Sequence, residues 1–340
     1  MRTTLVSCLL AATLSPVTLA SPFLERRADV VTTEQLNEFK FFAQYAGATY
    51  CNSYNDPGQK IVCSDGVCPD VEANNVTTVA SFGGPITDHR GFIAVDHTKK
   101  LIVISLRGTV SVRNWITDFI TTQTPCAITK GCLLHTGFFA SWLEISSAVF
   151  THTQASVKQF PTYRVVATGH SLGAATATIA AAYLRKQANI PVDIFTFGSP
   201  RVGNSAFAKF VTSQAGAEYR VTHDADPIAR LPPLIFNFRH TSPEYWLTSY
   251  TPGTSDVKFC DGHANLKCNG GTTGFNLDPH GWYFFKINGC ATGETPWKKM
   301  KSRQAGEVEG AHRDMTDKEI EAMLNQWVEA DKKLAAEVKE

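Results

Sequence analysis

Residues 165–186 read VVATGHSLGAATATIAAAYLRK and carry three signals in direct succession. An apolar run over 165–168 predicts a buried strand, and the alanine-rich stretch 172–186 predicts a helix. The pentapeptide GHSLG at 169–173 connects the two. Glycines on both sides of a serine allow the sharp turn from strand to helix that lifts the serine hydroxyl above a sheet. The stretch therefore predicts a nucleophile elbow with Ser171 as the nucleophile.

Further apolar runs on both sides of the elbow predict more strands. They cover residues 92–95, 101–106, 194–197 and 219–222, and a second helical stretch covers 205–214. Continuous apolar strands are typical of sheets buried on both faces, and strands that alternate with helices are typical of parallel sheets. We predict an α/β fold with a mostly parallel central sheet and helices on both faces.

The two ends of the chain differ from this central part. An amphipathic helix begins after Thr32, which forms a capping-box pattern with Gln35. Beyond Cys290 the composition becomes charged, and an amphipathic helix follows from Thr316, with Glu319 at the capping position. Its expected apolar face is Ile320, Leu324, Trp327, Leu334 and Val338. We assign residues 28–292 to one catalytic domain and 293–340 to a charged linker and C-terminal helix, which is either docked, removed or bound to a partner.

The first residues have the pattern of a secretory signal peptide. A short apolar stretch follows Arg2 and ends at small residues near Ala20, and it is too short and too interrupted to span a bilayer. The dibasic pair Arg26-Arg27 marks a candidate propeptide at 21–27. We therefore expect a secreted, extracellular protein that begins near Ala28.

The cysteine count agrees with export. Cys8 lies in the predicted signal peptide, and eight cysteines remain, enough for four disulfides in an oxidising compartment. Their spacings are not those of zinc ribbons or fingers, and we predict no metal site. Asn75 begins the sequon Asn75-Val76-Thr77 and is the candidate glycosylation site.

The formal net charge is +1. This balance gives no basic footprint for nucleic acid and no general attraction to anionic membranes. Contact with lipid would have to use local apolar surface.

A serine nucleophile needs a histidine base and a carboxylate that orients it, in the chain order serine, acid, histidine on this type of fold. Asp224 and Asp226 both follow the strand at 219–222 and fit the acid equally well. The candidates for the base are His240, His263, His280 and His312. The pattern of residues alone does not choose among them.

From residue 36 to residue 290 the sequence resembles the fungal class 3 triacylglycerol lipases. The resemblance rests on LRGT at 106–109 with NW at 114–115, TGHSLG at 168–173, FGSPRVGN at 197–204 and YRVTH at 219–223. It implies an α/β-hydrolase-like fold with Asp226 as the acid and His280 as the base, and oxyanion donors at Thr109 and Leu172. It also implies disulfides between Cys51 and Cys290, Cys63 and Cys68, Cys126 and Cys132, and Cys260 and Cys268.

The resemblance further implies a short helical lid at 110–119, with Val112, Trp115 and Ile116 on its apolar face. The sequence departs from the family at Ala174, where many members have a third glycine, and in the extension from Ala291 onward. That extension resembles the tail of a subgroup that also cleaves phospholipids.

We therefore expect a monomeric serine esterase that hydrolyses triacylglycerols at an oil–water interface, touches membranes or lipid droplets transiently and needs no cofactor. The rival activities are an sn-1 phospholipase and a feruloyl-type esterase on the same fold. A rival of another class is a catalytically inactive lipid-binding protein, but every position that catalysis needs is filled.

Overall fold

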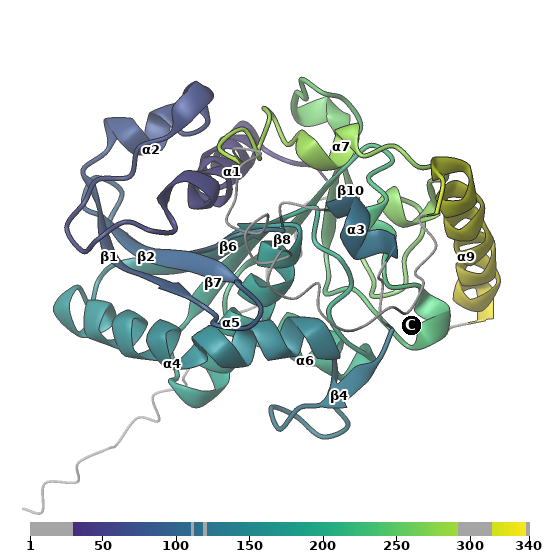
Figure 1. Ribbon diagram of the computed structural model, residues 1–340, viewed down its shortest axis with the longest axis horizontal. Helices are drawn as coiled ribbons and strands as arrows, with labels where there is room; N and C mark the ends of the chain where they lie inside the picture. The colour runs from purple at the N-terminus through teal and green to yellow at the C-terminus, as the bar shows by residue number, and fades with distance from the viewer. Residues whose placement is uncertain (1–29, 110–111, 118–120, 292–314, 338–340) are drawn as a thin grey trace, which may run out of the picture.

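The computed structural model describes residues 30–109, 112–117, 121–291 and 315–337 (Figure 1). Its centre is an eight-stranded sheet in the order β1-β2-β3-β6-β7-β8-β9-β10. The strands are β1 Val76–Gly83, β2 Arg90–Asp96, β3 Leu101–Leu106, β6 Arg164–His170, β7 Val192–Phe197, β8 Glu218–His223, β9 Glu244–Leu247 and β10 Val257–Cys260. Strands β3 to β9 of this sheet pair in parallel, while β1, β2 and β10 add antiparallel pairs at the edges. The expected mostly parallel sheet is confirmed.

Helices cover both faces of this sheet (Figure 1). The longer ones are α1 Thr33–Asn52, α4 Thr136–Gln159, α5 Leu172–Gln187, α6 Ser205–Ser213 and α9 Asp317–Glu337, and the short ones are α2 Pro69–Ala73, α3 Val112–Thr117 and α7 Asp278–Gly281. Helix α1 shares one apolar cluster with one face of the sheet, and α4, α5 and α6 share another with the opposite face. A small hairpin of β4 Gln123–Pro125 and β5 Leu133–His135 lies outside the main sheet.

Helix α1 forms as its sequence predicts. Thr32 and Gln35 make the reciprocal capping box, and Leu36, Phe39 and Phe42 are buried. The ring of Phe42 lies 4.2 Å from that of Phe195 in β7. The apolar face of α1 thus closes one side of the central sheet.

Four disulfides link the described residues: Cys51–Cys290, Cys63–Cys68, Cys126–Cys132 and Cys260–Cys268. They are the pairs that the resemblance implies. Cys51–Cys290 joins the end of α1 to the end of the catalytic domain, across 239 residues. The predicted signal peptide, propeptide and linker lie outside the described residues. Among the helices that the structure describes, none is long and apolar enough to cross a membrane.

Helix α9 differs in part from its predicted face. Thr316 and Glu319 form the expected cap, and Ile320 and Leu324 are buried. Leu334 is only half-buried, whereas Asp331 is 3% exposed. Val338 lies outside the described residues. A pattern of apolar residues does not predict a buried carboxylate on this face, because the burial of that carboxylate depends on a partner elsewhere in the fold.

Candidate active site

Ser171 sits at the sharp turn between β6 and α5. Its backbone has φ 58° and ψ −127°, and its amide donates to the carbonyl of Phe197 at 3.0 Å. A Cβ on Gly169 would collide with the backbone of Gly173, and one on Gly173 would collide with the carbonyl of Leu106. The two glycines of the pentapeptide therefore permit the elbow, and the positive φ of Ser171 is strain that the turn holds in place.

His280 and Asp226 form a buried pair. Nδ1 of His280 lies 3.0 Å from Oδ1 and 2.9 Å from Oδ2 of Asp226. The hydroxyl of Tyr283 donates to Oδ2 at 2.7 Å, and the amide of Ile228 donates to Oδ1 at 2.9 Å. Burial acts to raise the pKa of Asp226, but the charge of His280 and these hydrogen bonds together lower it. The carboxylate therefore stays ionised and holds a proton on Nδ1 of His280.

The other nitrogen of this histidine is available for chemistry. Nε2 of His280 is buried and makes no hydrogen bond within the described part of the chain. The ring lies 4.5 Å from the ring of His170, the residue directly before Ser171. Ser171 is 2% exposed, so the site is closed to solvent. Contacts between a serine and its base are often loose without substrate and tighten in the reacting complex.

The other candidates for the acid and the base lie elsewhere. Asp224 is half-buried, and its main-chain oxygen accepts from Trp246 and Asn269. The ring of His240 bonds to the carbonyl of Ala229, and that of His263 bonds to the carbonyl of His240. His312 lies outside the described residues. Among these candidates in the described part of the chain, only Asp226 and His280 form a pair of a carboxylate and an imidazole ring.

The loop after β3 touches the nucleophile. A Cβ placed on Gly108 would lie 3.2 Å from Cβ of Ser171 and would collide with the hydroxyl of Tyr50. Thr109 follows directly and is half-buried. Leu172 is the first residue of α5, where backbone amides have no acceptor within the helix. Both expected oxyanion donors therefore belong to segments adjacent to Ser171.

The sequence assigns no role to three further residues of the site. Gly198 has φ +58°, and a Cβ there would lie 2.9 Å from Oδ2 of Asp226 and 3.0 Å from Nδ1 of His280. Tyr283 bonds Asp226, and Tyr50 lies 2.9 Å from Nδ1 of His170. The segments quoted for the resemblance contain Gly198, but nothing in the sequence connects Tyr50 with His170, 120 residues away.

Part of the predicted lid is described. Helix α3 contains Val112 and Ile116, and Ile116 is 1% exposed. Both belong to an apolar cluster with Ile228 and Leu277, which lie two residues after Asp226 and three before His280. Helix α3 thus packs against the segments that carry the acid and the base. Residues 110–111 and 118–120, and the side chain of Trp115, lie outside the described residues.

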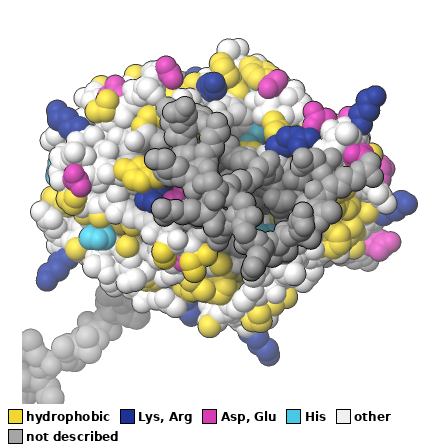
Figure 2. Space-filling view, viewed as in Figure 1, with side chains coloured by type: hydrophobic (Ala, Val, Ile, Leu, Met, Phe, Trp, Pro, Cys, Tyr) yellow, Lys and Arg dark blue, Asp and Glu magenta, His cyan; other side chains and the backbone are white. Residues whose placement is uncertain are grey.

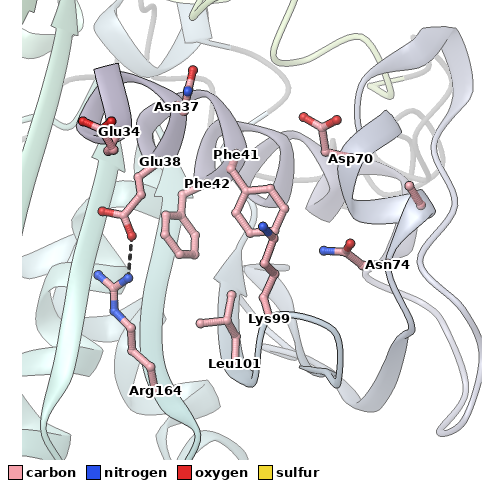
Figure 3. Close-up of a pocket in the computed structure, with 11 residues that line it drawn as sticks. Glu34, Asn37, Glu38, Phe41, Phe42, Asp70, Asn74, Lys99, Leu101 and Arg164 are labelled. Atoms are coloured by element: carbon pink, nitrogen blue, oxygen red, sulfur yellow. Dashed lines mark hydrogen bonds and ion pairs between the residues drawn. The ribbon is translucent and has the colours of Figure 1, made fainter. Parts of the chain in front are cut away.

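A cavity of about 640 Å³ lies beside the first residues of the central strands β3 and β6, at the end of β6 away from Ser171 (Figure 3). Glu38 and Arg164 point toward each other there at 2.6 Å, next to Phe41 and Phe42 of α1. Arg164 is the first residue of β6, whereas Ser171 follows its last residue. This cavity is therefore separate from the serine and takes no part in its chemistry.

The surface charges and the cysteines bear on two other kinds of binding, those of nucleic acid and of metal ions. Lysine, arginine and acidic side chains are scattered over the visible face, and neither sign gathers into one patch (Figure 2). Within the described residues, the groups that could hold a metal ion consist mainly of disulfide-bonded cysteines: Cys51, Cys63 and Cys290, and Cys63, Cys68 and Glu72. A metal binds the thiolate, which a disulfide does not offer.

Known proteins share both the sequence and the fold. Residues 103–236 match the family model for lipase (class 3), and residues 3–78 match the lipase 3 N-terminal region. Secreted mono- and diacylglycerol lipase 1 of Fusarium solani is 45% identical over 321 residues, 93% of this chain and 91% of that protein. This chain belongs to the class 3 lipase family.

Solved structures of other lipases support the same assignment. A mono- and diacylglycerol lipase from Aspergillus oryzae is 41% identical with a TM-score of 0.72, and the match covers 76% of this chain and 100% of that one. A triacylglycerol lipase described as having a serine protease triad is 29% identical with a TM-score of 0.70, covering 77% of this chain and 98% of that one. This lipase is thus an α/β-hydrolase-fold enzyme that hydrolyses carboxylic esters of lipids.

Proposed function

We propose that this lipase hydrolyses the acyl esters of triacylglycerols through a covalent intermediate on Ser171. His280 takes the proton of the serine hydroxyl as a general base and then gives it to the leaving alcohol as a general acid. Asp226 holds the histidine ring and stabilises its charged form. The single observation that carries this proposal is the buried pair of His280 and Asp226, at 2.9 Å, beside the serine of an elbow.

The negative charge of the tetrahedral intermediate is stabilised by the backbone amides of Thr109 and Leu172. The proximity of Gly108 to Ser171 and the position of Leu172 at the start of α5 support these two roles. Loss of one donor of this kind costs about 2.7 to 4 kcal/mol of transition-state stabilisation. Water then attacks the acyl-serine with His280 as the base, and the fatty acid leaves.

A preference for mono- and diacylglycerols is the second candidate. The Fusarium solani protein and a Penicillium cyclopium protein, 41% identical over 280 residues, are both named secreted mono- and diacylglycerol lipases. The match to the Penicillium protein covers 79% of this chain and 91% of that protein. The proposed chemistry at Ser171 is the same for all acylglycerols, and the two candidates differ in whether triacylglycerol is hydrolysed.

Helix α3 acts as the lid in this proposal. Its cluster with Ile228 and Leu277 supports a closed state over the acid and base segments, and movement of α3 onto a lipid surface opens the site. Equal turnover of a short ester below and above its solubility limit would contradict interfacial activation.

Export and modification complete the proposal. We infer cleavage after residue 20, trimming after Arg27 and secretion, and the names of the two relatives above support secretion. Asn75 is exposed at the start of β1, as an attached glycan requires. Amino-terminal sequencing of the secreted protein, and its mass before and after glycosidase treatment, test these inferences.

The experiment compares wild-type protein with Ser171→Ala and with the control Ser146→Ala, whose serine lies on α4 and donates to the carbonyl of Leu143 in the same helix. Substrates are emulsified tri-, di- and monoacylglycerols, phosphatidylcholine vesicles and a feruloyl ester. We expect fatty-acid release from triacylglycerol that disappears in Ser171→Ala and persists in Ser146→Ala.

Three other outcomes would change the conclusion. Release from mono- and diacylglycerols alone would establish the second candidate. Faster release from phosphatidylcholine would make the enzyme a phospholipase, and activity confined to the feruloyl ester would contradict a lipid substrate.

A further inference from the structure

The lid helix α3 and the C-terminal helix α9 share one apolar cluster. Ile116 of α3 is 1% exposed, and Ile320 and Leu324 of α9 are 0% and 2% exposed. The remaining members of the cluster are Val112, Ile228, Leu231, Phe275, Leu277, Met315, Met323 and Trp327. The closed position of α3 therefore includes burial against α9 as well as against the catalytic domain.

Polar contacts fix the same two segments to each other. Nη2 of Arg113 donates to the carbonyl of Met315 at 2.7 Å and to Oδ1 of Asp317 at 3.0 Å. The ion pair is exposed, with 41% of the Arg113 side chain and 75% of the Asp317 side chain accessible, so it adds little stability. Its geometry nevertheless aligns the first turn of α3 with the first turn of α9.

Helix α9 has separate anchors on the catalytic domain. The carboxylate of Asp331 is buried. It accepts hydrogen bonds from Nη1 of Arg201 at 3.2 Å and from the amide of Ile235 at 3.1 Å. Asn325 accepts from the amide of Gly274 at 2.8 Å. These contacts do not involve α3. Helix α9 can therefore stay in place when α3 moves, which makes α9 a fixed partner and α3 the moving one.

The match to a solved relative leaves part of this chain unpaired. The Aspergillus oryzae structure aligns over its whole length with 76% of this chain. The unmatched part is about as large as residues 1–29 and 292–340 together.

We propose that α9 is a clamp that holds the lid helix α3 closed and raises the threshold at which lipid opens this enzyme. The proposal rests on the function proposed for Ser171. Because α9 contacts the closed lid and its anchors do not depend on α3, it stabilises the closed state relative to the open one. A lipid surface favours the open state, so the two compete for α3.

Three substitutions in the full chain test the clamp. Ile320→Ala removes a buried side chain from the shared cluster, and Asp317→Asn removes the charge opposite Arg113. Val328→Ala is the matched control, because Val328 is also buried on α9 but is not part of the shared cluster. Activity is measured on a dissolved short-chain ester and on emulsified triacylglycerol, and hydrogen exchange is measured for residues 112–117.

We expect Ile320→Ala to raise turnover of the dissolved ester about tenfold, to leave turnover of the emulsion unchanged, and to speed exchange in α3. Asp317→Asn should give about a twofold rise, and Val328→Ala should match wild type. The clamp is overturned if hydrogen exchange in α3 is the same in Ile320→Ala as in wild type. It is also overturned if Val328→Ala changes turnover and exchange as much as Ile320→Ala does. Absence of ester hydrolysis in wild type overturns the proposed function instead, and the exchange measurement still decides the clamp.

Discussion

Nε2 of His170 lies 2.7 Å from the carbonyl oxygen of His280. A carbonyl only accepts, so this nitrogen carries the proton and donates. Nδ1 of His170 then accepts from the hydroxyl of Tyr50 at 2.9 Å. Burial, followed by the charge of His280, lowers the pKa of His170 to about 3, and burial raises the pKa of Tyr50. The residue beside the nucleophile is thus a neutral ring that fixes the backbone of the base.

Substitution of His170 should affect turnover more than binding. His170→Phe leaves the buried carbonyl of His280 without its donor, a loss of about 1 to 3 kcal/mol, so we expect kcat to fall about tenfold or more while KM changes little. His170→Gln retains a donor near the Nε2 position and should restore part of kcat. Equal loss in the two variants, with parallel losses of thermal stability, would indicate a structural role only.

Asp226→Asn should lower kcat about 10⁴-fold, because an amide no longer selects the tautomer with the proton on Nδ1. Tyr283→Phe removes one of the hydrogen bonds to Asp226 and should have a smaller effect. Asp224→Asn is the control, since this residue lies two positions away and does not contact His280 through the bonds described above. Steady-state kinetics on emulsified substrate measure all three. A large loss in Asp224→Asn with an active Asp226→Asn would reverse the assignment of the acid.

Stability should fall as the pH falls from about 6.5 toward 3. Burial lowers the pKa of His89 and of His170 to about 3, and it lowers the pKa of His240 well below 6.5. In this range the unfolded chain binds protons that the folded chain does not, so the free energy of unfolding decreases by up to about 1.4 kcal/mol per pH unit for each histidine. Denaturant melts at several pH values measure the slope. His89→Gln should reduce this slope by the contribution of one histidine. A slope equal to that of wild type would contradict the proposed role of His89 in the pH dependence.

Loss of the Cys51–Cys290 disulfide should destabilise the domain more than loss of Cys63–Cys68. The first closes 239 residues and the second closes 5. Removal of a native disulfide typically costs about 2 to 5 kcal/mol, and in the chain-entropy model the cost grows with the size of the loop. Each pair is replaced by two serines, and chemical denaturation is compared with wild type. The opposite order would show that local strain relief, not loop entropy, dominates.

The centre of the fold can be predicted from the sequence because its signals are local. The elbow follows from a serine between two glycines, α1 from an amphipathic pattern and β3 from a continuous apolar run, and each signal lies in contiguous residues. The edge of the sheet is harder to predict. Strand β9 contains Glu244, which is buried because it pairs with Arg220 and accepts from Thr222, both in the neighbouring strand β8. A charged residue in a short strand carries no apolar signal, and its partners lie more than 20 residues away.

In the candidate site too, contacts between residues far apart in the sequence could not be predicted. The elbow identifies Ser171 from nearby residues, but the choice of Asp226 over Asp224 depends on His280, which lies 54 residues further along the chain. The resemblance supplies that choice, whereas spacing does not. Tyr50 of α1 reaches the site only through the folded arrangement, so the sequence offers no reason to single it out, and Gly198 lies in a segment quoted for the resemblance without a role assigned to it.

The Cys51–Cys290 disulfide ends the covalently closed part of the enzyme before α9 begins. A chain is synthesised from its amino terminus, and domains fold as units during synthesis. The described strands, the elbow and the lid helix have therefore been synthesised before residues 315–337 leave the ribosome. If α9 is the clamp, each new molecule passes through a period in which its lid is unrestrained, and the lid becomes restrained only when α9 has been made.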